Sequence, residues 1–448
     1  MKQIFIQFGG TGDLVQKKLI PAYETLLGKN YDFHVIALGR RFEKQQEYLE
    51  AMGIQPESRL SRALHYLHFS MEDSSSKQKL IDVIHSLIGD ICDIELIYYI
   101  ALQPSLYESA IYDIRDIHEN LQGCRLRKKI VVEKPFGFDR TSAKYYNDIL
   151  VSVFEDSEIY RVDHYLGKEF MQNLLVLRFY NDVIKGIWNK DAIDHIQIIF
   201  DETHGVDQRL GFYEQIGVVR DTIQNHILQI VTHLFMGEPV DFSPQQISHE
   251  KIKVLKSIAP VTDFYLSRYE SLKYSRDDRP VETPTYCSFK LMVDTYDFSD
   301  IPVYVRTGKM QKEAISMIYI AFKHFKSTPD REHDVTDNAM IITIHPEMTI
   351  DLQLNMKEPN NSWEAKPVRL NFDHFKTFRV NTPEAYQQII EKIIISDKSL
   401  FPSMDEIMEA WNIVEPMLKA KDIEEYPDKT LPDSATSLIE QDGRTWFV

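Results

Sequence analysis

A short stretch in the first half of the chain, RVDHYLGKEF (residues 161–170), concentrates side chains that can do chemistry. It holds a carboxylate (Asp163), an imidazole (His164), a phenol (Tyr165) and an amine (Lys168), with one glycine among them. The stretch has neither the alternation of a half-buried strand nor the spacing of an amphipathic helix. What these groups do therefore depends on the elements that position them.

The length and composition indicate a globular, enzyme-like protein. The 448 residues are more than a single hydrophobic core usually accommodates, so we expect two domains. Apolar residues make up 43% of the chain and charged residues 27%. The net charge of −17 argues against non-specific binding to nucleic acid or to an anionic membrane.

The cysteines and the apolar runs bear on the cellular compartment. Cys92, Cys124 and Cys287 are far apart and form no CxxC motif, which argues against a disulfide framework or structural zinc and for a reducing compartment. The N-terminal apolar run is too short for a signal peptide, and no run of about 18 apolar residues exists. We therefore expect a cytoplasmic protein without membrane segments.

The first part of the chain alternates strand and helix signals. Apolar strand candidates are separated by helical patterns such as residues 77–89, which predicts a doubly wound, Rossmann-type parallel sheet. The strand candidates cover residues 3–8, 33–39, 95–102 and 128–137.

After about residue 190, strand candidates follow one another with little room for helices. This pattern predicts a larger α+β domain on a mainly antiparallel sheet, with helices over 217–236 and 404–420. We place the two domains at residues 1–165 and 166–448. The strand candidates cover residues 195–202, 286–294, 301–308, 316–323, 339–346, 348–356 and 368–373.

A glycine turn joins the first strand to the first helix. In this setting, backbone N–H groups can approach a pyrophosphate at the N-terminus of the helix. Val15 stands where the dinucleotide fingerprint usually has a third small residue. We nevertheless predict a dinucleotide site, formed by Gly9, Gly10, Thr11, Gly12, Asp13 and Leu14.

The end of the second strand indicates which coenzyme is bound. Coenzyme folds that prefer NAD place an acid there for the ribose 2′-hydroxyl, whereas this chain has Arg40 and Arg41 and no acid before Glu43. A guanidinium can bind a 2′-phosphate through two hydrogen bonds, so Arg40 favours NADP, with NAD possible. The alternative is that both arginines lie in a solvated loop.

The segment EKPFG (residues 133–137) ends a later strand of the same sheet. Because the carboxyl ends of strands in open α/β sheets face the ligand crevice, we expect Lys134 to point toward coenzyme and substrate. The alternative is an ordinary surface lysine before a turn.

Six motifs in this order resemble those of the glucose-6-phosphate dehydrogenase family. The resemblance covers nearly the whole chain, and its most specific part is the opening stretch, because nine residues of mixed chemistry do not recur by chance. The motifs are GGTGDL, EKPFG, RVDHYLGKE, RDTIQNH, IPVYVRTGK and DGRTW.

The resemblance implies roles for the opening stretch. His164, Tyr165 and Lys168 would hold the phosphate of glucose 6-phosphate, since a dianion needs several donors and a fixed cation. His226 would be the general base that takes the proton from the C1 hydroxyl while hydride leaves C1 for the nicotinamide. Asp163 would orient His226 and stabilise its imidazolium.

The resemblance also implies further substrate contacts. Glu202 and Asp221 would accept hydrogen bonds from sugar hydroxyls, and Lys134 and Lys309 would reach the substrate. Each carboxylate taken alone would be read as solvated, and His226 taken alone as a core histidine. No metal is required, and the family implies a homodimer or homotetramer.

Departures from the family pattern bear on three places. Ala314 stands where the family has a second basic substrate contact, with Lys312 as a possible substitute. Residues 101–104 read ALQP where the family has an ALPP-like stretch near the coenzyme, and residues 426–432 read YPDKTLP before the closing motif. The chain is also somewhat shorter than usual.

The leading hypothesis is an NADP-dependent dehydrogenase that converts glucose 6-phosphate to 6-phosphogluconolactone, the first step of the oxidative pentose phosphate pathway. One alternative is an NAD-preferring enzyme or a dehydrogenase of another sugar phosphate. Another is a non-catalytic homologue that binds the ligand and regulates a partner.

Overall fold

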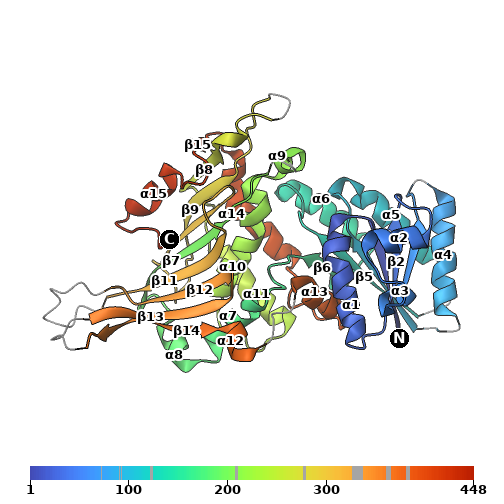
Figure 1. Ribbon diagram of the computed structural model, residues 1–448, viewed down its shortest axis with the longest axis horizontal. Helices are drawn as coiled ribbons and strands as arrows, with labels where there is room; N and C mark the ends of the chain where they lie inside the picture. The colour runs from blue at the N-terminus through green and yellow to red at the C-terminus, as the bar shows by residue number, and fades with distance from the viewer. Residues whose placement is uncertain are drawn as a thin grey trace. The chain divides into compact units, whose positions relative to one another are not determined.

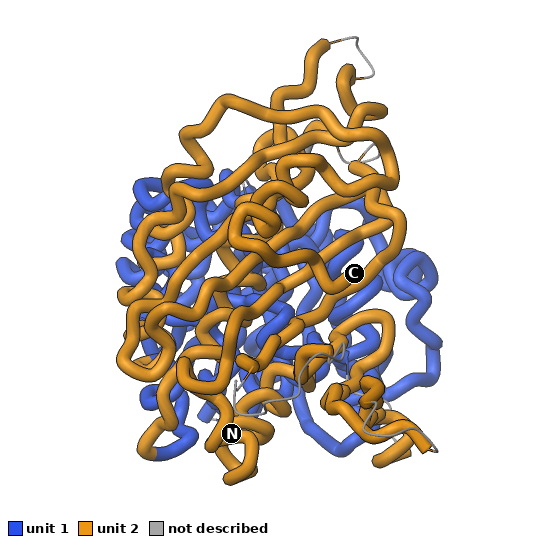
Figure 2. Tube along the Cα trace, turned by 90° about the vertical axis from the view of Figure 1, so that its left-hand side faces the viewer, with its two compact units in different colours: residues 1–168, 241–248, 383–408 blue, residues 169–240, 249–382, 409–448 orange. Residues whose placement is uncertain are grey.

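The computed structural model describes most of the chain as two compact units (Figure 2). The first unit comprises residues 1–168, 241–248 and 383–408, and the second comprises 169–240, 249–382 and 409–448. The described residues are 1–71, 73–89, 91, 93–121, 125–206, 210–275, 279–324, 336–359, 365–379 and 384–448.

The first unit is built on a six-stranded sheet, in which β2, β5 and β6 are labelled in Figure 1. The strand order is β3-β2-β1-β4-β5-β6, and all neighbouring strands pair in parallel. This is the order of dinucleotide-binding folds, and it confirms the predicted Rossmann-type sheet. The strands are β1 (Lys2–Phe8), β2 (His34–Gly39), β3 (Leu64–His68), β4 (Asp93–Ile100), β5 (Arg125–Glu133) and β6 (Ile159–Val162).

The strands of this sheet are apolar because both faces are covered. In β1 every residue from Gln3 to Phe8 is buried, as expected of a parallel strand between helical layers. The helices of the unit are η1 (Val15–Leu19), α1 (Ile20–Gly28), α2 (Gln45–Met52), α3 (Arg59–Ala63), α4 (Ser74–Ile88), η2 (Pro104–Leu106), α5 (Tyr107–Asn120), α6 (Arg140–Val151), η3 (Asp156–Glu158) and α13 (Ala385–Ile394).

One helix of the first unit, α13, comes from the far end of the sequence. Lys129 on β5 forms a buried ion pair with Glu95 on β4, 3.0 Å apart, and its ammonium also donates to the carbonyl of Ile393. The amide of Gln3 donates to the carbonyl of Ile394. These donors satisfy the C-terminal carbonyls of α13 and tie it to the parallel sheet.

The second unit contains a nine-stranded sheet in the order β14-β13-β12-β11-β7-β10-β9-β8-β15 (Figure 1). Its pairs are antiparallel except β7 with β10 and β8 with β15, which confirms the predicted, mainly antiparallel α+β domain. The strands are β7 (Ile193–Asp201), β8 (Phe264–Tyr269), β9 (Tyr286–Met292), β10 (Pro302–Gly308), β11 (Ile315–Phe322), β12 (Ala339–His345), β13 (Thr349–Lys357), β14 (Ala365–Asp373) and β15 (Glu424–Tyr426).

The helices of the second unit include a run that differs from the single helix predicted over 217–236. Gly217, with φ 61° and ψ 173°, kinks the end of α9, and the next segment, η5, winds as a π-helix before α10. The division between units passes through α11 and α14. The helices are α7 (Glu169–Phe179), α8 (Asp182–Ile187), α9 (Leu210–Val218), η5 (Val219–Ile227), α10 (Leu228–Phe235), α11 (Pro244–Lys256), η6 (Glu270–Leu272), α12 (His374–Phe378), α14 (Met404–Lys419) and α15 (Asp433–Glu440).

The structure also bears on the expectations about membrane segments and cysteines. Among the described residues, no helix combines the length and apolar character needed to cross a bilayer. Cys287 is a buried free thiol, whereas Cys92 and Cys124 lie outside the described residues.

Candidate active site

The glycine turn after β1 is held against the ends of two neighbouring strands. Gly10 donates from its amide to the carbonyl of Leu38 at 2.8 Å, and Gly12 donates to the carbonyl of Gly9 at 3.0 Å. Gly9 has φ +74°, and a Cβ there would lie 2.3 Å from the carbonyl oxygen of Ala101. Only glycine fits that position, so the tight turn before η1 is built into the sequence.

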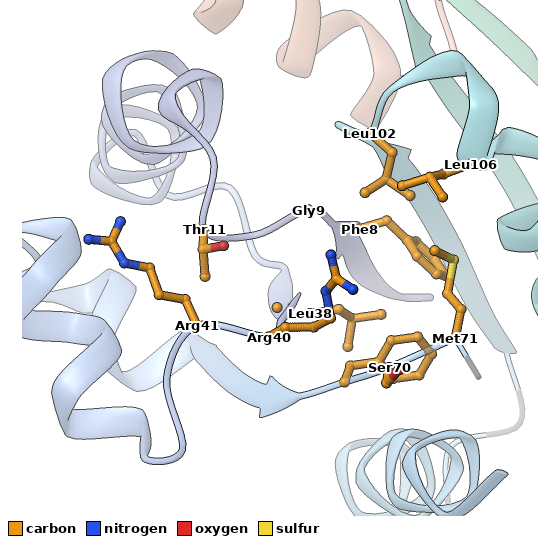
Figure 3. Close-up of a pocket in the computed structure, with 12 residues that line it drawn as sticks. Phe8, Gly9, Thr11, Leu38, Arg40, Arg41, Ser70, Met71, Leu102 and Leu106 are labelled. Carbon is orange, nitrogen blue, oxygen red and sulfur yellow. The ribbon is translucent and has the colours of Figure 1, made fainter. Parts of the chain in front are cut away.

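A cavity of about 410 Å³ opens beside this turn (Figure 3). It lies at the carboxyl edge of the parallel sheet, where such folds bind ligands. Leu102 of the ALQP segment is one of the residues that line it. Its lining residues are Phe8, Gly9, Thr11, Leu38, Gly39, Arg40, Arg41, Phe69, Ser70, Met71, Leu102 and Leu106.

The two arginines after β2 lie differently in this cavity. The side chain of Arg40 projects into the space between the glycine turn and Met71, whereas that of Arg41 extends away from it (Figure 3). The guanidinium carbon of Arg41 lies 5.4 Å from the centroid of the Phe42 ring. Arg40 is therefore the better placed of the two to meet a phosphate in the cavity.

The predicted phosphate-binding residues lie together in a turn that joins β6 to α7. The carboxylate of Asp163 accepts from the amide of Tyr165 at 2.9 Å, and the amide of Lys168 donates to the carbonyl of Tyr165 at 3.0 Å. The rings of His164 and Tyr165 are 5.0 Å apart. A Cβ at Gly167 would lie 2.7 Å from the carbonyl oxygen of Ala385, so only glycine permits this approach to α13.

The charge of Lys168 is set by its surroundings. Burial lowers the pKa of Lys168 to about 8, although the carboxylates of Asp163 and Glu384 act in the opposite direction. Lys18 in η1 pairs with Glu384 at 3.2 Å. Lys18 is therefore a second cation near this turn that the sequence interpretation missed, since only the folded chain brings η1 and the start of α13 together.

Glu133, directly before Lys134, is a half-buried acid that the sequence interpretation also missed. Its carboxylate accepts from the hydroxyl of Tyr99 at 2.5 Å and from that of Tyr386 at 3.3 Å. Burial raises the pKa of Glu133 to about 7. Lys134 is half-buried in the loop that follows β5, at the same carboxyl edge as the glycine turn.

In the second unit, three of the predicted substrate residues meet. The ammonium of Lys309, at the end of β10, lies 2.9 Å from a carboxylate oxygen of Glu202 and 3.3 Å from one of Asp221. These two carboxylates raise the pKa of Lys309 against the effect of its burial. The family resemblance assigns all three to the substrate, but no local pattern links them to one another, because they come from three separate elements.

His226 lies in η5 of the second unit and is buried. Its backbone amide donates to the side-chain oxygen of Asn225 at 2.7 Å. Asp163 belongs to the first unit, so the predicted pairing of Asp163 with His226 joins residues of different units.

Ala314 and Lys312 follow β10 in the same unit. Ala314 is half-buried and Lys312 is exposed. The substitution of Lys312 for the basic contact at position 314 stays a prediction from the sequence.

Two family models match the chain almost end to end. One, described as the NAD binding domain of glucose-6-phosphate dehydrogenase, covers residues 6–173. The other, described as the C-terminal domain of glucose-6-phosphate dehydrogenase, covers residues 175–447. The first unit thus contains a domain of the nicotinamide-coenzyme type.

Curated proteins and solved structures agree with these models. Glucose-6-phosphate 1-dehydrogenase of Aggregatibacter actinomycetemcomitans is 32% identical over 98% of this chain and 96% of its own. That of Bacillus subtilis is 29% identical over 100% of this chain and 98% of its own. A solved structure of glucose-6-phosphate dehydrogenase in complex with its substrate glucose-6-phosphate matches with a TM-score of 0.89 and 27% identity, over 99% of this chain and 98% of that one. The chain belongs to the glucose-6-phosphate dehydrogenase family.

Proposed function

We propose that the protein oxidises glucose 6-phosphate at C1 to 6-phosphogluconolactone and transfers the hydride to NADP. Family membership and relatives named glucose-6-phosphate 1-dehydrogenase support this proposal. The observation that carries it lies within the first unit. An imidazole, a phenol and an ammonium gather in the turn after β6, at the same carboxyl edge of the sheet as the glycine-lined cavity.

The turn after β6 is proposed to bind the phosphate of the substrate. His164, Tyr165 and Lys168 offer donors of three kinds, and a phosphate dianion is bound best where charged donors converge. The Lys168 ammonium would return toward its full charge when an anion binds beside it.

His226 is proposed as the general base and Asp163 as its partner. The imidazole would take the proton of the C1 hydroxyl, and the carboxylate of Asp163 would fix the ring and stabilise the imidazolium. The burial of both residues supports this pairing, because a buried charge needs a partner. Bound coenzyme would supply the hydride acceptor.

The Lys309 cluster is proposed to bind the sugar hydroxyls. Glu202 and Asp221 are acceptors and Lys309 is a donor, so together they can match the alternating hydroxyls of a pyranose. Lys134 is proposed to reach the crevice from the end of β5.

The coenzyme is proposed to be NADP, held by the turn from Gly9 to Leu14 and by Arg40. Two features of the cavity support this: Gly9 leaves no side chain in the turn, and the Arg40 side chain projects into the space. A guanidinium binds a 2′-phosphate better than a neutral ribose hydroxyl. NAD stays possible as a weaker coenzyme.

The protein is further proposed to act in the cytoplasm as a homodimer or homotetramer. Support for association comes from β14, an edge strand of the large sheet on which Val368 is 38% and Leu370 60% exposed. Light scattering of the purified protein across a dilution series tests this; a monomer at every concentration would refute it.

Absorbance of the reduced nicotinamide tests the activity. Purified protein receives glucose 6-phosphate with NADP, the same sugar with NAD, and glucose without phosphate. We expect reduction with glucose 6-phosphate and little with glucose. No reduction with any pair would favour a non-catalytic ligand-binding protein. Equal rates with glucose and its phosphate would overturn the roles of His164, Tyr165 and Lys168.

A further inference from the structure

The Lys309 ammonium has a third neighbour besides its two carboxylates. It lies 5.5 Å from the centroid of the Tyr213 ring, within the distance at which an aromatic face attracts a cation. The Lys309 side chain is only 13% exposed, so the attraction acts where water screens little. The ammonium thus sits between two carboxylates and an aromatic face.

Tyr213 is a buried residue of α9 whose hydroxyl forms no hydrogen bond with the residues that the structure describes. The side chain is 6% exposed. Burial, reinforced by the charges of Asp221 and Glu202, raises the pKa of Tyr213 well above its usual value, so the phenol stays neutral. What the residue offers to Lys309 is therefore its ring.

The kink at Gly217 explains how one helical run supplies two of the contacts. Tyr213 precedes the kink on α9 and Asp221 follows it on η5, yet both reach the same ammonium. A straight helix would place residues eight positions apart more than two turns from each other. The break therefore folds the ring and the carboxylate around Lys309.

An aromatic face restrains an ammonium without accepting a conventional hydrogen bond from its N–H donors. Lysine is a flexible side chain with three N–H donors. Glu202 and Asp221 engage two of them. Of the neighbours described, the Tyr213 ring fixes the position of the nitrogen while a third donor stays available for a ligand oxygen.

We propose that Tyr213 is a positioning residue that acts through its ring face, holding Lys309 between Glu202 and Asp221 so that its remaining donor meets a sugar hydroxyl. The proposal rests on the role given to Lys309 under the proposed function.

Two substitutions separate the ring from the hydroxyl. Tyr213→Phe keeps the face and removes the unpartnered hydroxyl, so KM for glucose 6-phosphate should stay near the original value and thermal stability should not fall. Tyr213→Leu removes the face, and KM should rise about tenfold, the loss of a desolvated cation–π contact, with kcat and the KM of the coenzyme little changed. If the Tyr213→Leu protein does not fold, Tyr213→Met serves as the second variant, because the flexible methionine side chain can fill the space without an aromatic face.

A double-substitution cycle tests whether the effect passes through Lys309. In a Lys309→Met background, Tyr213→Leu should leave KM unchanged, because the cation is gone. An equal loss in Tyr213→Phe and Tyr213→Leu, or a Tyr213→Leu effect that persists without Lys309, would overturn the proposal.

A readout without catalysis separates this proposal from the proposed function. Reductive methylation of Lys309, followed by mass spectrometry of its peptide, should be faster in Tyr213→Leu than in the original protein and unchanged in Tyr213→Phe. Unchanged methylation in Tyr213→Leu would reject the proposal even if the protein oxidised no sugar. Absence of sugar oxidation with faster methylation would reject only the proposed function.

Discussion

The ammonium nitrogen of Lys168 lies 3.6 Å from the centroid of the Tyr165 ring. Two residues of the proposed phosphate site thus hold each other in place before any ligand arrives, through a cation–π contact of short range. The charge on Lys168 matters to both interactions, to the ring and to a phosphate.

This relationship predicts a pH dependence of substrate capture. Burial lowers the pKa of Lys168 to about 8, so the amine is charged below that pH and neutral above it. kcat/KM for glucose 6-phosphate should therefore fall as the pH rises through about 8, since this ratio reports the free enzyme. Steady-state rates between neutral and alkaline pH measure the fall. Lys168→Arg is the matched control, because arginine keeps its charge; a fall at the same pH in that variant would assign it to another group.

Replacing the proposed base should slow the chemical step. His226→Asn should lower kcat by about 10² to 10⁴-fold, with a modest change in KM, because a positioned base acts in the transition state. Stopped-flow absorbance would follow the hydride step directly. Asp163→Asn should lower the same step, since Asp163 is proposed to orient the imidazole. An undiminished rate in His226→Asn would exclude it as the base.

The two arginines after β2 offer a matched pair for testing coenzyme choice. Arg40→Ala should raise KM for NADP and spare NAD, because only NADP carries the 2′-phosphate. Arg41→Ala, whose side chain extends away from the cavity in Figure 3, should have a smaller effect on NADP. Initial rates with both coenzymes measure each ratio. A loss in Arg40→Ala that is equal for NADP and NAD would refute the assignment.

A buried ion pair next to Glu202 should contribute strongly to the free energy of unfolding. A guanidinium nitrogen of Arg306 lies 2.9 Å from a carboxylate oxygen of Asp201, and both side chains are 6% exposed. Arg306→Met should lower the free energy of unfolding by about 3–5 kcal/mol, because it leaves a buried carboxylate without its partner.

The charge of Asp201 gives this prediction a pH signature. Burial raises the pKa of Asp201 to about 6, above its value in the unfolded chain, so unfolding releases a proton between about pH 4 and 6. The loss in Arg306→Met should therefore shrink as the pH falls. Urea unfolding at several pH values measures it, with the double variant Asp201→Asn, Arg306→Met as the control. A double variant less stable than Arg306→Met would contradict the account.

Much of the fold could be predicted from the sequence because its signals are local. The strands from β9 to β13 fall within a few residues of the ranges expected from apolar patterns. The glycine turn could be recognised because Gly9 must approach Ala101 closely. Short or polar strands gave no such signal: β3 (Leu64–His68), β6 (Ile159–Val162), β8 (Phe264–Tyr269) and β15 (Glu424–Tyr426) were not predicted.

Apart from what the family resemblance implies, the candidate site was predictable only where its residues are neighbours in sequence. His164, Tyr165 and Lys168 share one turn, so a motif reveals them. Lys18 with Glu384, and Tyr213 with Lys309, meet only after folding, and no local pattern links them. The π-helical winding of η5 also could not be predicted, because the spacing of apolar residues does not distinguish a π-helix from an α-helix.

The place of α13 has a consequence for biosynthesis. Gln3 and Lys129 donate hydrogen bonds to the carbonyls of Ile394 and Ile393. The parallel sheet therefore cannot complete its packing at the time when only its own six strands have emerged from the ribosome. Domains at the start of a chain usually fold first, but here the earliest strands complete their packing only after α13 (Ala385–Ile394) has been translated. A nascent chain stalled before that segment would expose an unfinished face to chaperones.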